Sequence, residues 1–295
     1  MTGLVKKLAI ATSVAVGMTA IGSAPAFAGT LTNPQFGGTA ASDYLSYCSN
    51  GSSTYAGPTC TDSLSTILSG NSSAPGGNIE LAASSEQGGF DFTKNTALTG
   101  KIGGKDIVIS SLTQSDWMSV LGNGKTLLSQ WLDDAFLAHS ISSEFKPFVQ
   151  QAFLANNGMQ RFSDPNISYV NQDNATGEIS IGLAGHFNAS NMLKEALGNH
   201  PLLSLFVPNE VKASELVKVI YDNGPAKFLY SFTATDALQA NKHGVGADGV
   251  SHNGNYEVKL AGVPVTSVPE PSTMLALMAV GGLVATSKRK SAKNA

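Results

Sequence analysis

Each end of this chain carries an apolar segment beside lysines, and the two segments confine any globular fold to the residues between them. At the N-terminus, Lys6 and Lys7 precede an apolar run over residues 8–21, and Ala26 and Ala28 form an A-x-A site. A positive segment, an apolar run and small residues at a cleavage site are the three parts of a secretory signal peptide. We therefore expect export by Sec-type machinery and cleavage by signal peptidase after Ala28. The alternative is an anchor that stays attached.

The C-terminal segment has the reverse order. Residues 274–285 form an apolar run, and Lys288, Arg289 and Lys290 follow it. With its polar neighbours the run reaches about 24 Å as a helix at ~1.5 Å per residue, against a hydrocarbon core of about 30 Å. Taken alone, it also fits a buried core helix. Because a basic cluster stays on the cytoplasmic side of a membrane, and because the signal peptide sends the middle of the chain outside, we expect a membrane-spanning helix.

Pro269, Glu270 and Pro271 stand directly before this run. A Pro-Glu-Pro triplet, an apolar segment and a basic cluster, in that order over residues 266–290, resemble the PEP-CTERM sorting signal. The resemblance implies that exosortase, a membrane protease-transpeptidase, recognises the triplet and processes the tail. It also implies a protein of the cell envelope, either held by its C-terminal helix or released to the surface or extracellular matrix. The expected parts are a signal peptide (1–28), an exported ectodomain (29–265) and the sorting signal (266–295).

Charge excludes one class of partner. Residues 29–268 hold 12 Lys or Arg against 20 Asp or Glu, a net charge of −8, and Arg161 is their only arginine. An acidic body repels phosphate backbones. We therefore expect no binding to nucleic acid.

Cys48 and Cys60 are the only cysteines of the chain. The exported compartment is oxidising, so a pair of cysteines favours a disulfide. Gly51, Gly57 and Pro58 lie between them and allow the chain to turn back. A metal site is disfavoured because no second Cys or His pair lies nearby.

Alternating apolar residues predict strands at both ends of the ectodomain, and a helical period predicts helices in its middle. Gly103-Gly104 and residues 173–177 are the expected hairpin turns. The predicted strands are residues 78–84, 96–102, 105–112, 166–185 as a hairpin, and a last pair over 226–234 and 255–262. Helices are predicted over residues 143–156, 190–197 and 211–221, and two more within residues 115–141. Of these two, the first has Trp117, Val120 and Leu121 on one face and Ser115 or Asp116 as its cap. The second has five apolar residues on one face: Leu128, Trp131, Leu132, Ala135 and Phe136. We expect an α+β fold with an antiparallel sheet and a central helical section.

Residues 77–117 resemble the ectodomain of a PEP-CTERM subfamily known chiefly from cyanobacteria. That subfamily carries no assigned activity, so the resemblance implies no catalytic residues.

Several short patterns suggest chemistry, and each has a plainer interpretation. "GNGKT" (122–126) is similar to a phosphate-binding loop, but such a loop needs a Gly where Ser119 stands and a strand before it. A turn between two helices is favoured. Asp173, Asn174 and Glu178 lack the Gly that a Ca²⁺ loop requires, so they predict a plain hairpin turn. Asp133 and Asp134 are neighbours on a helix, point about 100° apart and fit a solvated edge.

The remaining candidates are histidines and aromatic residues. No pair among His139, His186, His200, His243 and His252 has the spacing of a zinc site. His243 and His252 share a Gly-rich loop with Asp248, which is the one candidate metal loop; a solvated loop is the alternative. Four aromatic residues suggest either a sugar-stacking surface or, as the helical spacing favours, core packing: Phe145, Phe148, Phe153 and Phe162.

No complete catalytic constellation appears along the chain, and we expect no catalytic residue, metal or cofactor. The leading hypothesis is an exported surface or matrix protein without enzymatic activity. A secreted hydrolase is the alternative, since its residues can come from distant positions. A binding module for extracellular polysaccharide, with or without Ca²⁺, is the third.

Overall fold

The structure, a computed structural model, describes residues 29–50, 54–56, 59–205, 207–234 and 254–265. The chain divides into two units, residues 1–264 and residues 265–295. The helices and strands described below all belong to the first unit.

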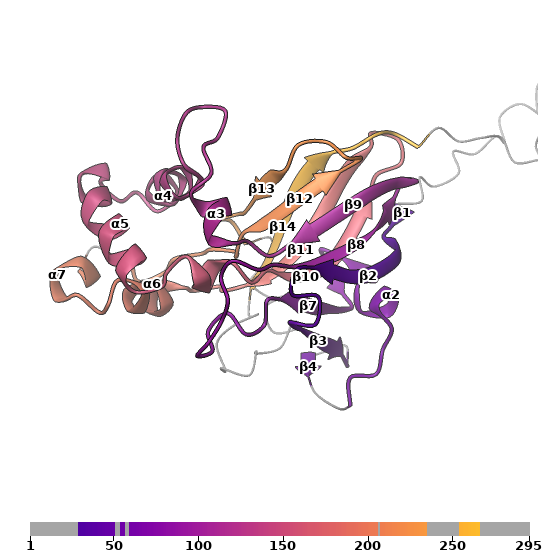
Figure 1. The fold of residues 1–295 in the computed structure, drawn as a ribbon, viewed down its shortest axis with the longest axis horizontal. Coiled ribbons are helices and arrows are strands. Elements are labelled where there is room, and N and C mark those ends of the chain that lie inside the picture. The colour runs from indigo at the N-terminus through magenta and orange to yellow at the C-terminus, as the bar shows by residue number, and fades with distance from the viewer. Residues whose placement is uncertain (1–28, 51–53, 57–58, 206, 235–253, 266–295) are drawn as a thin grey trace, which may run out of the picture. The chain divides into compact units, whose positions relative to one another are not determined.

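Two antiparallel sheets form the body of this unit (Figure 1). The larger sheet has the order β14-β11-β10-β7-β3-β4, and β1 lies beside β10 next to β7. Its strands are β14 (Gly254–Ala261), β11 (Glu178–Gly185), β10 (Asn166–Gln172), β7 (Gly77–Leu81), β3 (Tyr44–Ser49), β4 (Thr54–Ala56) and β1 (Gly29–Thr30). The smaller sheet has the order β13-β12-β9-β8-β2. Its strands are β13 (Lys227–Leu229), β12 (Val217–Tyr221), β9 (Lys105–Ser110), β8 (Thr96–Ile102) and β2 (Thr32–Gly38).

Apolar side chains from both sheets form one core between them. Ile79, Ile181 and Val258 come from the larger sheet and Leu98 and Ile109 from the smaller, and all belong to one buried cluster. A short helix, α2 (Leu64–Ile67), adds Ile67 to this core. A small hairpin of β5 (Gly70–Asn71) and β6 (Ala74–Pro75) forms a third sheet. Burial of this apolar surface is the main force that holds the two sheets together.

All the other described helices gather beyond one end of the strands, away from α2 (Figure 1). They are α3 (Gln114–Trp117), α4 (Leu127–Ala138), η1 (Ser143–Phe145), α5 (Lys146–Ala155), η2 (Gln160–Phe162), α6 (Ser190–Ala196) and α7 (Pro201–Ser204). They surround a second core of edge-on and tilted rings, in which Trp131 contacts Trp117, Phe153 and Phe162 at centroid distances of 5.7, 5.4 and 4.9 Å. The described part of the unit therefore has one core between the sheets and one among the helices.

The predicted α+β class, with antiparallel pairing and a helical section, is confirmed, although the strands form two principal sheets. Both hairpins lie where the sequence predicts them. Gly103 and Gly104 have φ angles of +57° and +79°, as a two-residue hairpin turn requires. In the turn after β10, the Asp173 carboxylate accepts hydrogen bonds from the backbone of Ala175 and Thr176. These bonds close the hairpin turn that the sequence predicts over residues 173–177.

Two predictions about the C-terminal third are wrong. Residues 217–221 form strand β12 instead of the end of a helix, because β-branched residues alternate there between the core and the far face of the sheet. The predicted last strand pair is also wrong, since β13 pairs with β12 in the smaller sheet and β14 pairs with β11 in the larger. Strand β13 pairs with β12, its neighbour in sequence, because closing the short turn at Asp222 and Asn223 costs less entropy than closing a long loop to β14.

Two details of the helices also differ from expectation. Thr113, not Ser115 or Asp116, caps α3: its side chain accepts from the Asp116 backbone, and the Asp116 carboxylate accepts from the Thr113 backbone. Phe148 does not join Val149 and Phe153 in the core, since 63% of its surface is exposed. Phe153 and Phe162 are buried among other rings and Phe145 packs against the same core, so core packing is confirmed for three of the four aromatic residues and is wrong for Phe148.

Candidate functional site

Residues 159–166 pass from the helices into strand β10 at the junction of the two cores. The Trp117 indole donates a 2.7 Å hydrogen bond to the Ser163 hydroxyl, which itself donates to the Met159 carbonyl. The Leu112 amide donates to the Ser163 carbonyl at 3.0 Å. These buried bonds fix the backbone on the N-terminal side of Asp164.

A polar groove, here called the junction groove, opens beside this segment. It encloses about 440 Å³ between residues 85–90, which follow β7, and the end of α5 with the start of η2. Amide side chains predominate on its walls: Gln87, Asn156, Asn157 and Gln160. The rest of the lining is Ser85, Glu86, Phe90, Arg161 and two glycines. The Arg161 guanidinium is held by Glu195 at 3.2 Å and Glu86 at 3.5 Å. Planar amides with one aromatic ring and one held arginine can donate and accept hydrogen bonds toward a hydroxyl-rich ligand.

Behind the wall of the groove lie two buried carboxyl groups, Asp164 and Glu215, here called the acid pair. Ser85 lines the groove and donates a hydrogen bond of 2.5 Å to Oδ2 of Asp164. Asn166 donates from Nδ2 to Oε2 of Glu215 at 3.2 Å. The exposed fractions of Asp164, Asn166 and Glu215 are 8%, 2% and 4%.

The surroundings of the acid pair disfavour negative charge. Burial, and next the charge of Glu80, raise the pKa of Asp164 well above its usual value. Burial, and next the charge of Asp164, raise the pKa of Glu215 in the same way. Among the residues that the structure describes, no Lys, Arg or His forms an ion pair with either group. Each carboxyl therefore opposes ionisation of the other.

A second polar groove, of about 290 Å³, lies where the β5–β6 hairpin covers the larger sheet. The Tyr169 hydroxyl donates to Oε2 of Glu257 at 2.8 Å, and Lys259 binds Glu178 at 2.6 Å. The hairpin is fastened by a bond from the Asn171 amide to the Gly70 carbonyl. Its glutamates are thus already engaged with neighbouring side chains.

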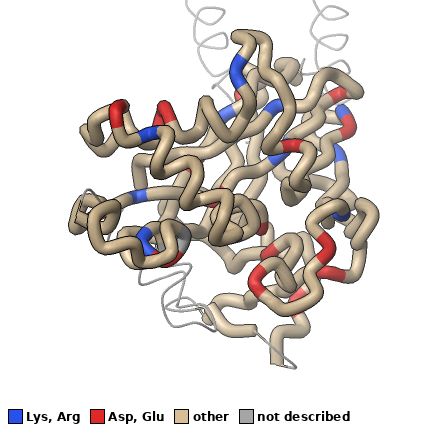
Figure 2. Tube along the Cα trace, turned by 60° about the vertical axis from the view of Figure 1, so that its left-hand side comes forward, with Lys and Arg blue, Asp and Glu red and all other residues tan. Residues whose placement is uncertain are grey.

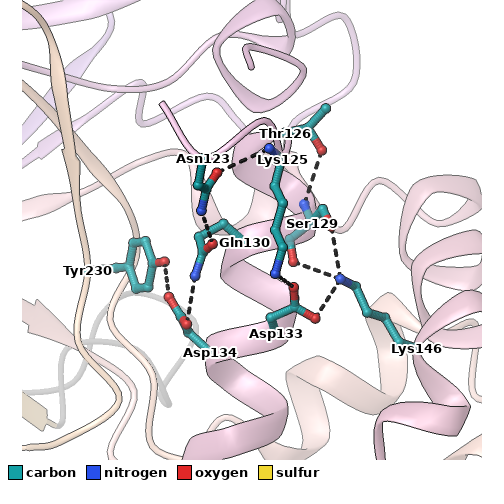
Figure 3. A network of polar contacts seen from close by, with 9 residues as sticks. All are labelled: Asn123, Lys125, Thr126, Ser129, Gln130, Asp133, Asp134, Lys146 and Tyr230. Carbon is teal, nitrogen blue, oxygen red and sulfur yellow. Dashed lines mark hydrogen bonds and ion pairs between the residues drawn. The ribbon is translucent and has the colours of Figure 1, made fainter. Parts of the chain in front are cut away.

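The loop that is similar to a phosphate-binding loop joins α3 to α4, as its plainer interpretation predicts (Figure 3). Lys125 of the loop binds Asp133 of the following helix, α4, at 2.9 Å, and Lys146 of α5 binds the same carboxylate at 2.6 Å. Asp134 points to other partners, the Tyr230 hydroxyl and the Gln130 amide. The two aspartates do not face each other, as predicted, but both hold neighbouring elements in place instead of forming a free solvated edge.

The structure does not bring the predicted histidines together. His139 lies at the end of α4, where its Nε2 contacts the Lys212 carbonyl at 3.1 Å, and His200 caps α7. His186 follows β11, and the candidate loop of His243, Asp248 and His252 lies outside the described residues. Over the described ranges, no three Asp, Glu, His or Cys side chains converge as a metal site. Lys and Arg lie scattered among Asp and Glu (Figure 2).

The remaining predicted residues concern export and the disulfide. Cys48 of β3 is joined to Cys60, as predicted for two cysteines in an oxidising compartment. Four other predictions lie outside the described residues: the cleavage residues Ala26 and Ala28, the triplet Pro269-Glu270-Pro271, the apolar run 274–285 and the basic residues Lys288-Arg289-Lys290. Within the ranges that are described, none of the helices is long and apolar enough to cross a membrane.

Comparison with known proteins identifies one feature of the chain. Residues 267–290 match the family model of the PEP-CTERM protein-sorting motif. The motif indicates an exported protein that exosortase processes and that is sorted to the cell surface. No curated protein and no solved structure matches the chain.

Proposed function

We propose that this protein is a cell-surface protein without enzymatic activity, whose ectodomain binds extracellular polysaccharide in the junction groove. The observation that carries the proposal is the groove itself, which has the volume of a ligand site and walls of four amides, an arginine, a phenylalanine, a serine and the Glu86 carboxylate. The amides hydrogen-bond to hydroxyls without performing chemistry on them, and Glu86 is paired with Arg161. The proposal includes export by signal peptidase and Sec-type machinery, a C-terminal membrane helix, and kinship with the chiefly cyanobacterial subfamily.

Binding is tested by calorimetry with polysaccharide isolated from the host's own extracellular matrix. The variants Gln87→Ala and Gln160→Ala each remove an amide that lines the groove. Each should weaken binding about five- to tenfold, the value of one or two hydrogen bonds. Gln151→Ala is the matched control, because Gln151 is an exposed amide on α5 outside the groove. No heat with the wild-type protein, or equal loss in the control, would overturn the proposal.

One observation favours a hydrolase as the second candidate. Asp164 has a raised pKa, as a general acid needs, and Ser85 connects it to the groove. Against this, Asp164 does not line the groove itself. Release of reducing ends from the same polysaccharide, abolished in Asp164→Asn, would establish the hydrolase and refute a purely binding role.

Export and processing have their own test. Intact mass should be measured on protein taken separately from the membrane fraction and the culture medium of the host. A chain that starts at Gly29 and ends near Pro269 is expected. A tail retained through Ala295 in the membrane fraction would mean that the apolar run is a permanent anchor and would exclude removal by exosortase.

A further inference from the structure

The acid pair shares its buried space with acceptor atoms that have no donor. Oδ1 of Asp164 and Oδ1 of Asn166 are buried without a hydrogen-bond partner, although the other atom of each side chain is bonded. Buried polar atoms are almost always paired, and an unpaired group calls for a water or an ion. Here the unpaired atoms are oxygens, so the missing partner is a proton donor or a cation.

Asn166 provides an observation separate from the acidic residues. Its side chain is 2% exposed, and Nδ2 donates both to Oε2 of Glu215 and to the backbone carbonyl of Asp164. Because Nδ2 contacts both acidic residues, Oδ1 of the same short, planar amide lies within a few ångströms of the Glu215 carboxyl group and the Asp164 backbone. The asparagine thus adds a neutral oxygen to the two acidic ones.

The charges around the acid pair also favour a bound cation. Glu80 of β7 acts on both members of the acid pair and raises the pKa of each, and its own Oε2 accepts from the Tyr47 hydroxyl at 2.9 Å. As noted above, no cationic side chain of the described residues pairs with Asp164 or Glu215. A buried carboxylate without a cationic partner costs several kcal/mol, and a bound cation removes that cost.

We infer that Asp164, Asn166 and Glu215 form a binding site for a single Ca²⁺ ion behind the junction groove. Ca²⁺ takes six to eight oxygen ligands in flexible geometry, from carboxylates, amide carbonyls and water. The protein provides two carboxyl groups and one amide oxygen as ligands. Such a site holds only two acidic side chains, so it does not require three Asp, Glu, His or Cys residues to converge. Mg²⁺ fits less well because it demands near-ideal octahedral geometry and retains its waters. The site is separate from the proposed polysaccharide contact.

The test uses the full-length protein in detergent after removal of metal by a chelator. Titration calorimetry with CaCl₂ should show one Ca²⁺ per chain. Thermal unfolding should shift upward by about 5–10 °C at a hundredfold excess over the Kd, and MgCl₂ should give a smaller shift. Asp164→Asn and Glu215→Gln should each weaken Ca²⁺ binding at least tenfold, since even outer-shell changes cost 10–100-fold.

Two matched controls locate the ion. Asp248→Asn alters the candidate loop of the sequence, and Asp173→Asn alters an exposed hairpin turn; both should bind Ca²⁺ like the wild type. Binding lost in Asp248→Asn but kept in Asp164→Asn would overturn the inference. So would a wild-type protein with no heat and no thermal shift, a result that means the acid pair is simply protonated. The wild-type titration decides the matter even if a variant fails to fold.

Discussion

The Ser85 hydroxyl donates a 2.5 Å hydrogen bond to Oδ2 of Asp164, across 79 residues of sequence. Ser85 lines the junction groove, whereas Asp164 belongs to the acid pair behind it. One bond therefore connects the wall of the groove to the buried carboxyl group. A change in the charge of Asp164 therefore changes the strength of a bond that the groove's own Ser85 makes.

Replacement of Ser85 by Ala should destabilise the protein by about 1–3 kcal/mol, because it leaves a second oxygen of Asp164 buried without a partner. Ser84→Ala is the matched control. Its hydroxyl also donates to an aspartate, Asp43, but that contact is only partly buried and the Ser84 backbone amide donates to the same carboxylate. Urea unfolding of both variants checks the difference. Equal costs would mean that burial of Asp164 adds nothing to the value of the bond.

The two glycines of the β8–β9 turn should differ in their tolerance of alanine. Both have positive φ angles, so alanine strains either position by about 1–2 kcal/mol. At Gly103 a Cβ would also meet Oε1 of Gln172 at 2.1 Å, whereas nothing lies within 4 Å at Gly104. Gly103→Ala should therefore lower the unfolding midpoint more than Gly104→Ala does. A larger effect at Gly104 would contradict the packing of Gln172 against this turn.

Asp133 should contribute more stability than an exposed ion pair does. Burial alone would raise its pKa, but the bonds to Lys146 and Lys125 outweigh burial and lower the pKa (Figure 3). Asp133→Asn should cost about 1–2 kcal/mol, whereas Asp106→Asn, at an exposed pair with Lys101, should cost almost nothing. Because the folded pKa is lowered, this stability is present above about pH 4 and is lost as the pH falls further. Urea unfolding at pH 7 and pH 3 measures both effects.

Local patterns predict much of this fold, and long-range pairing accounts for what they miss. The β8–β9 hairpin and helix α4 follow from turn residues and apolar periods within short windows. The division into two sheets does not, since β3 pairs with β7 and β14 with β11 across long stretches of chain. Residues 217–221 are a short apolar run, and such runs do not distinguish a strand from a helix.

The candidate site is harder still to predict. Asn166 and Glu215 are 49 residues apart, and no spacing rule connects them to Ser85. The only local signals are an aspartate before Pro165 and a single glutamate before the apolar run of β12. Neither pattern suggests a buried acid, because isolated acidic residues usually lie at the surface.

The acid pair should make the metal-free protein less stable as the pH rises. Asp164 and Glu215 have folded pKa values well above their usual ones, so the folded state binds more protons than the unfolded state does. The stability is complete below about pH 4, the unfolded pKa, and is lost as the pH rises through the raised pKa values. The charge of Glu80 raises the pKa of both carboxyl groups, and the charge of Glu86 raises the pKa of Asp164. The buried Tyr256 also interacts with Glu215. The charged groups among these neighbours are all acidic.

His139 opposes this loss of stability over part of the pH range. Burial lowers the pKa of His139, so its contribution to stability grows as the pH rises through about 6.5. The comparison with Asp164→Asn separates the two effects, since His139 is present in both proteins. Thermal unfolding of chelator-treated protein from pH 5 to pH 8 should therefore fall more steeply for the wild type than for Asp164→Asn.

Ca²⁺ should remove the difference in pH dependence between the wild type and Asp164→Asn. Protons and the cation compete for the same oxygens, so CaCl₂ should raise the unfolding temperature of the wild type more at pH 8 than at pH 5. The variant Asp164→Asn should respond weakly at both pH values. A Ca²⁺ effect of equal size at pH 5 and pH 8 would place the ion on carboxylates that are ionised throughout, such as those exposed at the surface, and not on the acid pair.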